Sequence, residues 1–314
     1  MTSEIDQTSG RSAPLVTFAM ITYNQQRYVR DAVMSALAQQ CDPLEIILSD
    51  DCSSDETFDI MKAAVSGYHG PHTIVLRQEP VNRGLIAHLN TVVKMARGDY
   101  VVIAAGDDLS NPDRVAALSQ KMKDQPLLIH SGFDVFDENG NPMQIEPPDE
   151  ALRSGNLGKI AGARALYVGA TGCWHRDLLA KFGPMEYAEA YEDLIMGYRA
   201  ALEGRIAYVD RPLIRYRVGS GITTRHEDTR ARNIRACRAM IAAFDQRLAD
   251  TRRHYPDRHD LIAIIEKERL RDSAVVAWYS DPSEFIRRYS WRPAVQRYFV
   301  SVAFARIRRR FFHR

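Results

Sequence analysis

Cysteine is scarce in this chain of 314 residues, and the four cysteines, at positions 41, 52, 173 and 237, lie far apart. None has CxxC spacing or belongs to a Cys/His cluster, which argues against a structural zinc site and a disulfide framework. No stretch approaches the roughly 18–20 apolar residues that span a bilayer. The polar N-terminus, residues 1–13, has no apolar signal core, so we expect a disordered lead-in and a cytoplasmic protein, with peripheral contact to the inner membrane as an option.

Common phosphate-binding motifs are also absent. The sequence has no GxxxxGK[ST] loop, and no GxGxxG follows the first predicted strand. A ligand phosphate is therefore expected to be held through a metal ion. The net charge of +2 excludes no class of binding partner. The basic residues lie in no recognised nucleic-acid module, so nucleic acid is not an expected partner.

Short runs rich in Val, Ile and Leu alternate with helical patterns as far as about residue 126. Such alternation is typical of an α/β fold with a mainly parallel sheet and helices on both faces. Asn111-Pro112-Asp113 has the composition of a helix start, with Asn as the N-cap and Pro in the first turn. Strands are predicted at residues 15–22, 44–50, 73–78 and 100–105, and helices at about 26–39, 55–66 and 85–96.

The pattern changes after residue 126. A strand is predicted at 127–136, a hairpin turn at Asn139-Gly140, and short strands after that. A helix around YEDLIMGYRAALEG and a strand at 206–218 follow, and from about residue 225 the chain is expected to be helical. This second half is predicted to complete a site over the first.

Polar residues stand directly after three of the predicted strands: Thr22-Tyr23-Asn24, Asp50-Asp51 and Asp107-Asp108. The carboxyl ends of parallel strands lie along one edge, where α/β proteins bind ligands. Two adjacent carboxylates repel each other less when they share a divalent cation, and Mg²⁺ or Mn²⁺ in such a site usually also binds substrate phosphates. For Asp50-Asp51 alone, SDDCSSDET also permits a simpler interpretation, the cap of the following helix.

These stretches resemble glycosyltransferase family 2. The resemblance rests on TYNQQRYVRDAVMSALAQQ, EIILSDDCSSDET, NRGLIAHLN, GDYVVIAAGDDLSNPDRV, YEDLIMGYRA and YRVGSGIT, in this order. It implies a GT-A-like catalytic domain over residues 14–224, with a nucleotide-sugar half to about 126 and an acceptor half after it. Residues 225–314 would form a helical, basic C-terminal extension.

The implied activity is transfer of a sugar, with inversion, from a nucleotide-diphosphate donor to an acceptor hydroxyl. The expected donor is a UDP-sugar, with a dTDP-sugar as the alternative, and the expected cofactor is Mn²⁺ or Mg²⁺. The acceptor would be a saccharide or lipid-linked saccharide in bacterial surface polysaccharide or glycolipid synthesis. The rival interpretations are a degenerate relative serving as a subunit or scaffold, and a sugar-phosphate nucleotidyltransferase. The latter normally has a glycine- and basic-rich loop after the first strand, which TYNQQRY lacks.

The resemblance also implies a role for each matching residue. The acidic pair Glu192-Asp193 would supply the catalytic base, with Asp193 as the base itself, although first-turn acids stabilised by the helix dipole would look the same. Asp108 would be the main metal ligand, and Asp107 would contact the ribose or share the metal. The nucleotide would be bound by Thr22, Tyr23, Asn24, Asp50 and Asp51 and by the loop Asn82, Arg83 and Gly84, while Arg217 would lie near the diphosphate and Thr171 and Trp174 near the acceptor.

Several positions depart from the family pattern or allow a simpler interpretation. Ala105 stands where many relatives have a further Asp, and His226 is the nearest histidine after the YR pair, so a third protein ligand for the metal stays open. Trp174 suits either sugar stacking or core packing. His88 and Asn90 are expected to be helix residues without direct chemistry.

The C-terminal segment from Glu284 to Arg314 contains nine arginines and one acidic residue. Val295, Tyr298, Phe299 and Val302 fall on one helical stripe. Such a helix either packs on the domain with solvated arginines or lies on an anionic membrane surface.

Overall fold

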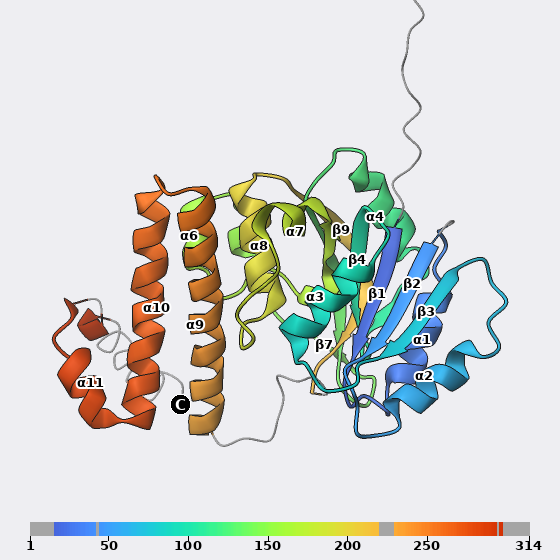
Figure 1. Cartoon of the computed structure of the whole chain (residues 1–314), viewed down its shortest axis with the longest axis horizontal. Coiled ribbons are helices and arrows are strands. Elements are labelled where there is room, and N and C mark those ends of the chain that lie inside the picture. The colour runs from blue at the N-terminus through green and yellow to red at the C-terminus, as the bar shows by residue number, and fades with distance from the viewer. Residues whose placement is uncertain (1–15, 42–43, 220–228, 294, 298–314) are drawn as a thin grey trace, which may run out of the picture.

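The computed structural model describes residues 16–41, 44–219, 229–293 and 295–297. A sheet of nine strands organises the chain as far as residue 217 (Figure 1). Strands β1 (Val16–Thr22), β2 (Leu44–Asp50), β3 (Thr73–Gln78) and β4 (Tyr100–Ala105) pair in parallel, as the sequence predicts. The strand order is β3-β2-β1-β4-β8-β6-β9-β5, with β7 paired to β6.

The second half makes this a mixed sheet. Strand β8 (Cys173–His175) is antiparallel to both β4 and β6 (Leu128–Phe136), whereas β9 (Ile206–Arg217) is parallel to β6. Strand β5 (Leu109–Ser110) pairs with β9, which brings the end of β9 beside the turn that follows β4. The short strand β7 (Pro142–Met143) forms the predicted hairpin with β6, and Gly140 in its turn has φ +86°.

Helices cover both faces of the sheet, because successive side chains of each strand point to opposite faces. Phe18 and Ile46 pack with α1 (Val29–Leu37), α2 (Thr57–Val65) and α4 (Arg114–Met122). Ala19 and Ile47 pack in the core with α3 (Leu85–Met95) and α8 (Glu192–Leu202).

Two local predictions were wrong. Helix α4 begins at Arg114, and the Asn111 side chain donates to Pro212 O at 2.9 Å instead of capping the helix. The segment after β7 forms mostly short helices rather than strands. These are α5 (Glu150–Arg153), α6 (Leu157–Gly162), the 3₁₀ turn η1 (Gly169–Thr171) and α7 (Asp177–Phe182). Asn156 starts α6 by accepting a hydrogen bond from Lys159 N at 2.9 Å, a local cap that favours helix over strand.

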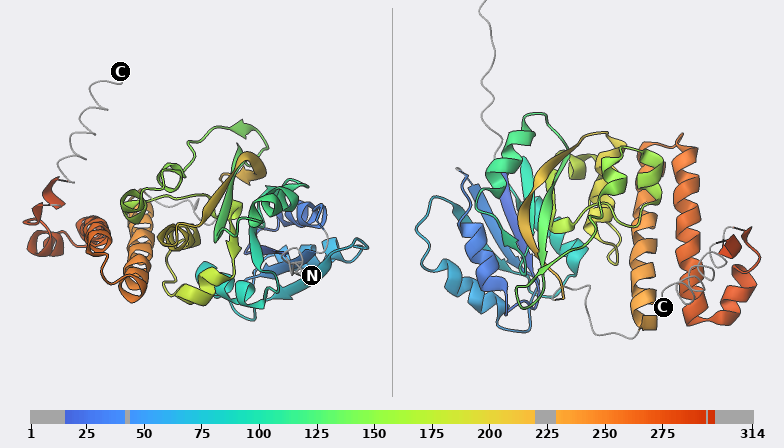
Figure 2. Two further views of the ribbon diagram at one scale, coloured as in Figure 1. Left: turned by 90° about the horizontal axis from the view of Figure 1, so that it is seen from above. Right: turned by 180° about the vertical axis from the view of Figure 1, so that it is seen from behind.

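The C-terminal extension consists of α9 (Thr229–His254), α10 (His259–Ser280) and α11 (Pro282–Arg288). The long helices α9 and α10 lie side by side next to α8 (Figures 1 and 2). Phe244 and Leu261 belong to the same apolar core as α3 and α8, and Arg199 of α8 forms a buried ion pair with Asp250 of α9 at 2.8 Å. The extension therefore shares its core with the sheet domain, and the division near residue 224 stays a prediction.

The expected lead-in, residues 1–13, and most of the predicted apolar stripe, Tyr298, Phe299 and Val302, lie outside the described residues. Within the described part of the chain, no helix is both long enough and apolar enough to cross a membrane.

Candidate active site

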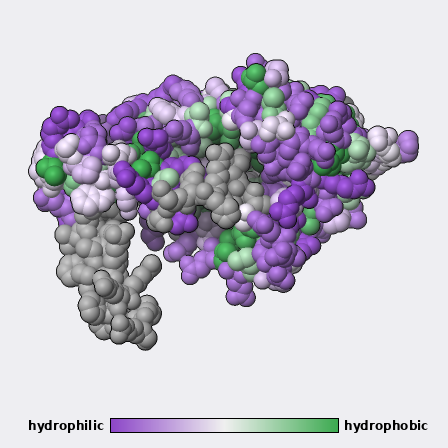
Figure 3. Space-filling view, turned by 90° about the horizontal axis from the view of Figure 1, so that it is seen from below, coloured by the Kyte–Doolittle hydropathy of each residue, from purple (hydrophilic) through white to green (hydrophobic). Residues whose placement is uncertain are grey.

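The carboxyl ends of the parallel strands lie at the lower side of Figure 1, and Figure 3 shows that side from below as a mostly hydrophilic surface. Thr22 pairs with Asp50, and Ile21 with Ala105, so β1, β2 and β4 end in register. The backbone N–H of Asp51 donates to Thr22 O at 2.9 Å. The polar residues that follow these strands therefore meet at one edge of the sheet.

Asp51 holds the loop of residues 82–84. Its two carboxylate oxygens accept the backbone N–H groups of Arg83, at 2.8 Å, and Gly84, at 2.9 Å. Gly84 has φ +76°, a backbone conformation that favours glycine, and its N–H also reaches Asn82 Oδ1 at 2.9 Å. Residues 82–84 are exposed, so the loop forms part of the rim at this edge of the sheet.

Asp50 and Thr22 lie beneath this rim. Asp50 is fully buried, and its carboxylate accepts from the Thr22 hydroxyl at 3.1 Å, from Gln78 Nε2 at 2.9 Å and from Ser53 N at 2.9 Å. Thr22 is also buried. The Thr22 and Asp50 side chains are thus bonded to each other beneath the rim. The contact of Thr22 with the nucleotide base, supported by Asp50, stays a prediction.

Tyr23 and Asn24 directly follow β1 and are more exposed than Thr22 and Asp50. Tyr23 is half-buried and Asn24 is exposed. Asn24 has φ +52°, and its side-chain oxygen accepts the N–H of Ser54 at 2.9 Å. Asn24 thus ties the loop after β1 to the loop after β2.

Two residues of α3, which were expected to have no direct chemistry, make structural hydrogen bonds. His88 is buried and hydrogen-bonded to the Ser49 hydroxyl at 2.6 Å, and burial lowers its pKa. The Asn90 side chain bonds both backbone groups of Met185 at 2.8 and 3.0 Å. Asn90 thereby anchors the loop that precedes α8.

Asp107 and Asp108 are both buried at the turn after β4, being 6% and 5% exposed. Asp108 Oδ1 accepts the backbone N–H of Arg217 at 2.8 Å, whereas Oδ2 is buried and has no hydrogen-bond partner among the described residues. Burial, followed by the neighbouring charge of Asp107, raises the pKa of Asp108 well above its usual range. A buried carboxylate oxygen without a donor fits a ligand position for a cation.

Carboxylate oxygens suit Mg²⁺ or Mn²⁺, so the donor set agrees with the predicted metals. Across residues 16–41, 44–219, 229–293 and 295–297, no cluster of three or more His, Cys, Asp or Glu suited to a metal is found. Ala105 supplies no ligand atom, and His226 lies outside the described residues. The described part of the chain therefore supplies two carboxylates as candidate metal ligands. A metal ion held by two carboxylates has further coordination positions for phosphate and water.

Arg217 is joined to this turn by backbone and side chain. Besides its N–H bond to Asp108, its Nε donates to Asp107 O at 3.0 Å. The guanidinium lies over the rings of Tyr28, at 4.2 Å, and Phe136, at 4.3 Å. Arg217 therefore stands beside the acidic pair in an orientation set by its hydrogen bonds and by the two rings.

Glu192 and Asp193 open helix α8, and both are half-buried. Burial raises the pKa of both carboxyls, and the Glu192 charge raises that of Asp193 further. Gly169 of η1 packs directly on Glu192, because a Cβ at position 169 would lie 1.9 Å from Glu192 Oε1. The absence of a side chain at Gly169 is thus what leaves room for the Glu192 carboxyl.

Tyr216 interacts electrostatically with both acidic pairs and was not singled out in the sequence. Burial raises its pKa to about 12, and the further contributions come from the charges of Asp108, Asp107, Asp193 and Glu192, in that order. The charges of both acidic pairs therefore act on one phenol, which strand β9 places directly before Arg217. Its position directly before Arg217 in YRVG was the available signal.

The two predicted acceptor residues are buried. Trp174 is 0% exposed and donates from Nε1 to Tyr167 Oη at 2.9 Å. Thr171 is 1% exposed, and its hydroxyl donates to Val168 O at 2.7 Å. Stacking on a sugar needs an exposed ring face, so the structure supports core packing for Trp174 and removes both residues from the acceptor surface.

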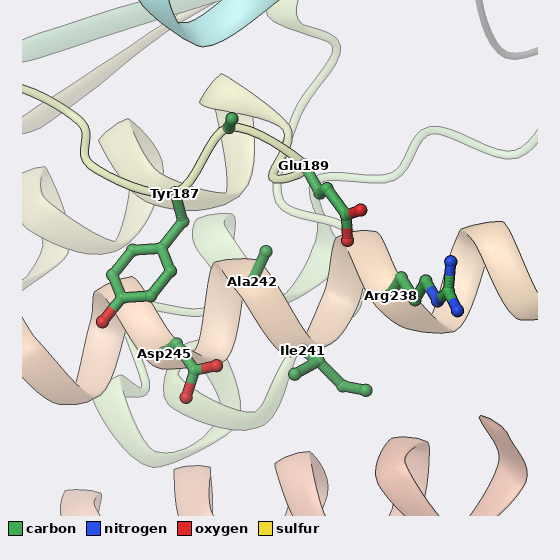
Figure 4. A pocket seen from close by; sticks show the side chains of 7 residues that line it. Tyr187, Glu189, Arg238, Ile241, Ala242 and Asp245 are labelled. Atoms are coloured by element: carbon green, nitrogen blue, oxygen red, sulfur yellow. The ribbon is translucent and has the colours of Figure 1, made fainter. Parts of the chain in front are cut away.

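An open recess of about 270 Å³ lies between the loop that leads into α8 and helix α9 (Figure 4). Tyr187 and Glu189 reach into it from the loop, and Arg238 and Asp245 line it from α9. Ile241 and Ala242 complete its apolar part. The recess therefore combines an aromatic ring with charged hydrogen-bonding groups, and one of these, Glu189, lies three residues before Glu192.

Sequence comparison assigns the family. The model described as Glycosyl transferase family 2 matches residues 17–181, which include both strand-end acidic pairs. The chain belongs to glycosyltransferase family 2. Its likeness to curated proteins is partial: EpsE of Bacillus subtilis (strain 168), a glycosyltransferase by name, is 38% identical over 133 residues, covering 41% of this chain and 46% of EpsE. EpsH of the same organism is 27% identical over 227 residues, covering 68% of this chain and 64% of EpsH.

Solved structures agree on the fold of this family 2 chain. TarS residues 1–349 of S. aureus, in complex with UDP-GlcNAc, superpose with a TM-score of 0.59 at 16% identity, over 88% of this chain and 76% of that one. The mannosyltransferase PcManGT of Pyrobaculum calidifontis, in complex with GDP-Man and Mn²⁺, gives 0.59 at 18% identity, over 94% and 81%. The predicted GT-A-like architecture with a helical C-terminal region is thus confirmed.

Proposed function

We propose that this family 2 glycosyltransferase moves a sugar, with inversion, from a nucleotide-diphosphate sugar to an acceptor hydroxyl. We propose a UDP-sugar as donor, in the synthesis of a bacterial surface polysaccharide or glycolipid. The observation that carries the proposal is the buried Oδ2 of Asp108, which has no hydrogen-bond partner among the described residues and lies beside Arg217 where the parallel strands end. The UDP-GlcNAc bound to TarS and the GDP-Man bound to PcManGT support a nucleotide-sugar donor.

On the donor side, Tyr23 would stack on the base and the loop 82–84 would close over it, held by Asp51. Asp108 and Asp107 would hold Mn²⁺ or Mg²⁺, which would neutralise charge on the diphosphate. The Mn²⁺ in PcManGT supports this choice of cofactor. Arg217, fixed between two rings, would donate to the same phosphates.

On the acceptor side, Asp193 would act as the general base. Its carboxylate would take the proton of the acceptor hydroxyl while that oxygen bonds to the anomeric carbon and the bond to the diphosphate breaks. Burial raises the pKa of Asp193, and a carboxylate with a raised pKa is a stronger base than an ordinary aspartate. Attack from the side opposite the leaving group gives inversion.

For the acceptor we propose a saccharide or lipid-linked saccharide, bound in the recess of Figure 4. The ring of Tyr187 suits the C–H face of a sugar, and Glu189, Arg238 and Asp245 suit its hydroxyl groups. Asp245 is already oriented by Arg269 at 2.5 Å. The recess replaces Thr171 and Trp174 as the proposed acceptor surface.

We also propose a cytoplasmic protein that contacts the anionic inner face of the membrane through its C-terminal end. In the described part, Trp278, Ile286 and Trp291 are 48%, 65% and 64% exposed. Exposed Arg287, Arg288 and Arg292 lie among them in the sequence. Aromatic and aliphatic side chains interleaved with arginine are typical of a surface that lies on anionic lipid.

The test is a screen of nucleotide-sugars with Mn²⁺ for donor hydrolysis and transfer. Asp108→Asn should lose metal-dependent nucleotide binding, whereas Asp193→Asn should keep binding and lose turnover. Asp149→Asn, a change at a buried carboxylate on another part of the sheet domain, is the matched control and should keep both.

Full turnover by both site variants would refute the assignment. Failure of the wild type with every donor would favour a degenerate subunit. Formation of a nucleotide-sugar from a sugar phosphate and a nucleoside triphosphate would identify a nucleotidyltransferase instead.

A further inference from the structure

Helix α9 of the C-terminal extension places one arginine at the start of α8. Arg247 is 0% exposed, and its Nε donates to Leu194 O at 3.1 Å. Leu194 directly follows Asp193 in the first turn of α8. The extension therefore bonds to the helical turn that carries the proposed base.

The same guanidinium also holds the end of helix α6. Its Nη1 donates to Ala161 O at 3.1 Å and to Ala163 O at 2.8 Å. These carbonyls lie at the C-terminus of α6, where a cation interacts favourably with the helix dipole. Arg247 thus joins three helices, α6, α8 and α9, at one buried point.

Among the described residues, Arg247 forms no ion pair with a carboxylate, and its buried Nη2 has no hydrogen-bond partner there. The carbonyl that accepts from Nε belongs to the residue directly after Asp193, and the Arg247 charge lowers the pKa of Asp193, against the larger effect of burial. Glu192, Tyr167 and Tyr216 also interact electrostatically with Asp193. None of those three is cationic.

We propose that Arg247 is a positioning residue through which the C-terminal extension fixes the turn carrying Asp193 and supplies the positive charge with which this carboxylate interacts. The proposal rests on the proposed role of Asp193 as the base. It assigns the extension a part in the reaction itself, in addition to its share of the apolar core.

Two substitutions separate charge from geometry. Arg247→Gln keeps an N–H donor for the carbonyls and removes the charge, whereas Arg247→Lys keeps the charge and loses the branched donor. The matched control is Arg164→Gln. Arg164 follows Ala163 and also joins this segment to the extension, but its ion-pair partner is Asp272 of α10, at 2.6 Å.

The first measurement is an NMR titration of Asp193, with ¹³C-labelled aspartate and assignment by Asp193→Asn. Arg247→Gln should raise the Asp193 midpoint by about 1 pH unit, because an opposite charge at short range favours the ionised form. The acidic limb of the pH–rate profile should move by the same amount. Arg247→Lys and Arg164→Gln should leave the midpoint near that of the wild type, and Arg247→Lys should lower kcat through misplacement of the turn.

A reciprocal measurement covers the case in which Arg247→Gln does not fold. Asp193→Asn removes the interacting charge at a half-buried position, and it should shift the ¹⁵Nε–H signal of Arg247, while Asp149→Asn should not. An unchanged Arg247 signal, or an unchanged Asp193 midpoint in Arg247→Gln, would overturn the proposal. Because neither NMR measurement needs turnover, retained activity in Asp193→Asn would refute the base assignment separately.

Discussion

The backbone N–H of Arg217 donates to Oδ1 of Asp108 at 2.8 Å, across 109 positions of sequence. The bond occupies one carboxylate oxygen and leaves the other, Oδ2, buried without a donor in the described part of the chain. Strand β9 therefore sets the orientation of the carboxylate that follows β4. The proposed metal-binding group and the proposed phosphate-binding group are parts of one unit.

Replacing Arg217 by lysine should weaken this unit. Lysine loses the Nε–H bond to Asp107 O and the flat contact with Tyr28 and Phe136, while the backbone bond to Asp108 remains. We expect kcat/KM for the donor to fall roughly 10- to 100-fold. Arg215→Lys is the control on the same strand, because the Arg215 guanidinium is exposed and only overlies Phe136 at 4.7 Å. Equal losses in the two variants would contradict the assignment.

Gly169→Ala tests the placement of Glu192. The new Cβ would lie 1.9 Å from Glu192 Oε1, so the carboxyl must move. Since the two acids are adjacent and electrostatically coupled, transfer should fall roughly 10- to 100-fold while donor binding stays. Gly67→Ala adds a methyl group where no atom lies within 4 Å and should change neither. A fully active Gly169→Ala enzyme would show that the position of Glu192 is unimportant.

Asp193→Asn should stabilise the fold at neutral pH. The folded-state pKa of Asp193 is raised, so the native state binds its proton more tightly than the unfolded chain does. Stability of the wild type is therefore lost as pH rises from the unfolded value, about 4, through the raised folded value. We expect the variant to melt about 2–4 °C higher at pH 8 and to match the wild type near pH 3.5.

The control for that melting experiment is Asp59→Asn, since Asp59 is an exposed residue of α2 paired with Lys62. It should show no gain at either pH. A variant Asp193→Asn that melts below the wild type at pH 8 would mean that the ionised carboxylate stabilises the fold.

Tyr187→Ala tests the recess as the acceptor surface. Loss of the ring should raise KM for a saccharide acceptor roughly 10-fold, because a stacking contact is worth about 1 kcal/mol or more. Donor hydrolysis should be unchanged, since Tyr187 lies outside the donor groups. Tyr68→Ala, at a partly buried tyrosine that packs beside α2, is the control. An acceptor KM unaffected by Tyr187→Ala would exclude the recess.

The membrane proposal can be tested with vesicles of anionic phosphatidylglycerol. The double change Ile286→Ser and Trp291→Ser removes exposed apolar surface and should weaken binding roughly 10-fold. Met34→Ser, at a residue of α1 that is 48% exposed, should bind as the wild type does. Binding of neutral and anionic vesicles alike, or no effect of the double change, would refute the proposal.

Much of the donor side could be predicted because it depends on local pattern. Apolar runs place β1, β2 and β4, and parallel pairing then brings Thr22, Asp50 and Asp107 to one edge. The function of individual side chains was harder to predict. Thr22 and Tyr23 are adjacent at the end of the same strand, so the sequence suggests the same role for both. In the structure the Thr22 hydroxyl donates to Asp50, and this depends on the packing of β1 against β2.

The acceptor side depended on long-range packing and was predicted less well. Trp174 and Tyr187 are both aromatic residues before α8, and nothing in their neighbourhood in the sequence shows which one is exposed. Trp174 is enclosed because β8 is inserted between β4 and β6, whereas Tyr187 lies in a loop against α9.

The sequence by itself determined the alternating elements, the two acidic pairs and, through their ordered motifs, the family. These features follow from residue type and short spacing, which act within one strand, turn or helix. Tertiary structure alone decided that Arg217 orients Asp108 and that Arg247 reaches the turn of Asp193. Each of these contacts joins residues more than 20 positions apart in the sequence. Such a contact forms only when the strands and helices pack together and bury the charged side chains next to each other.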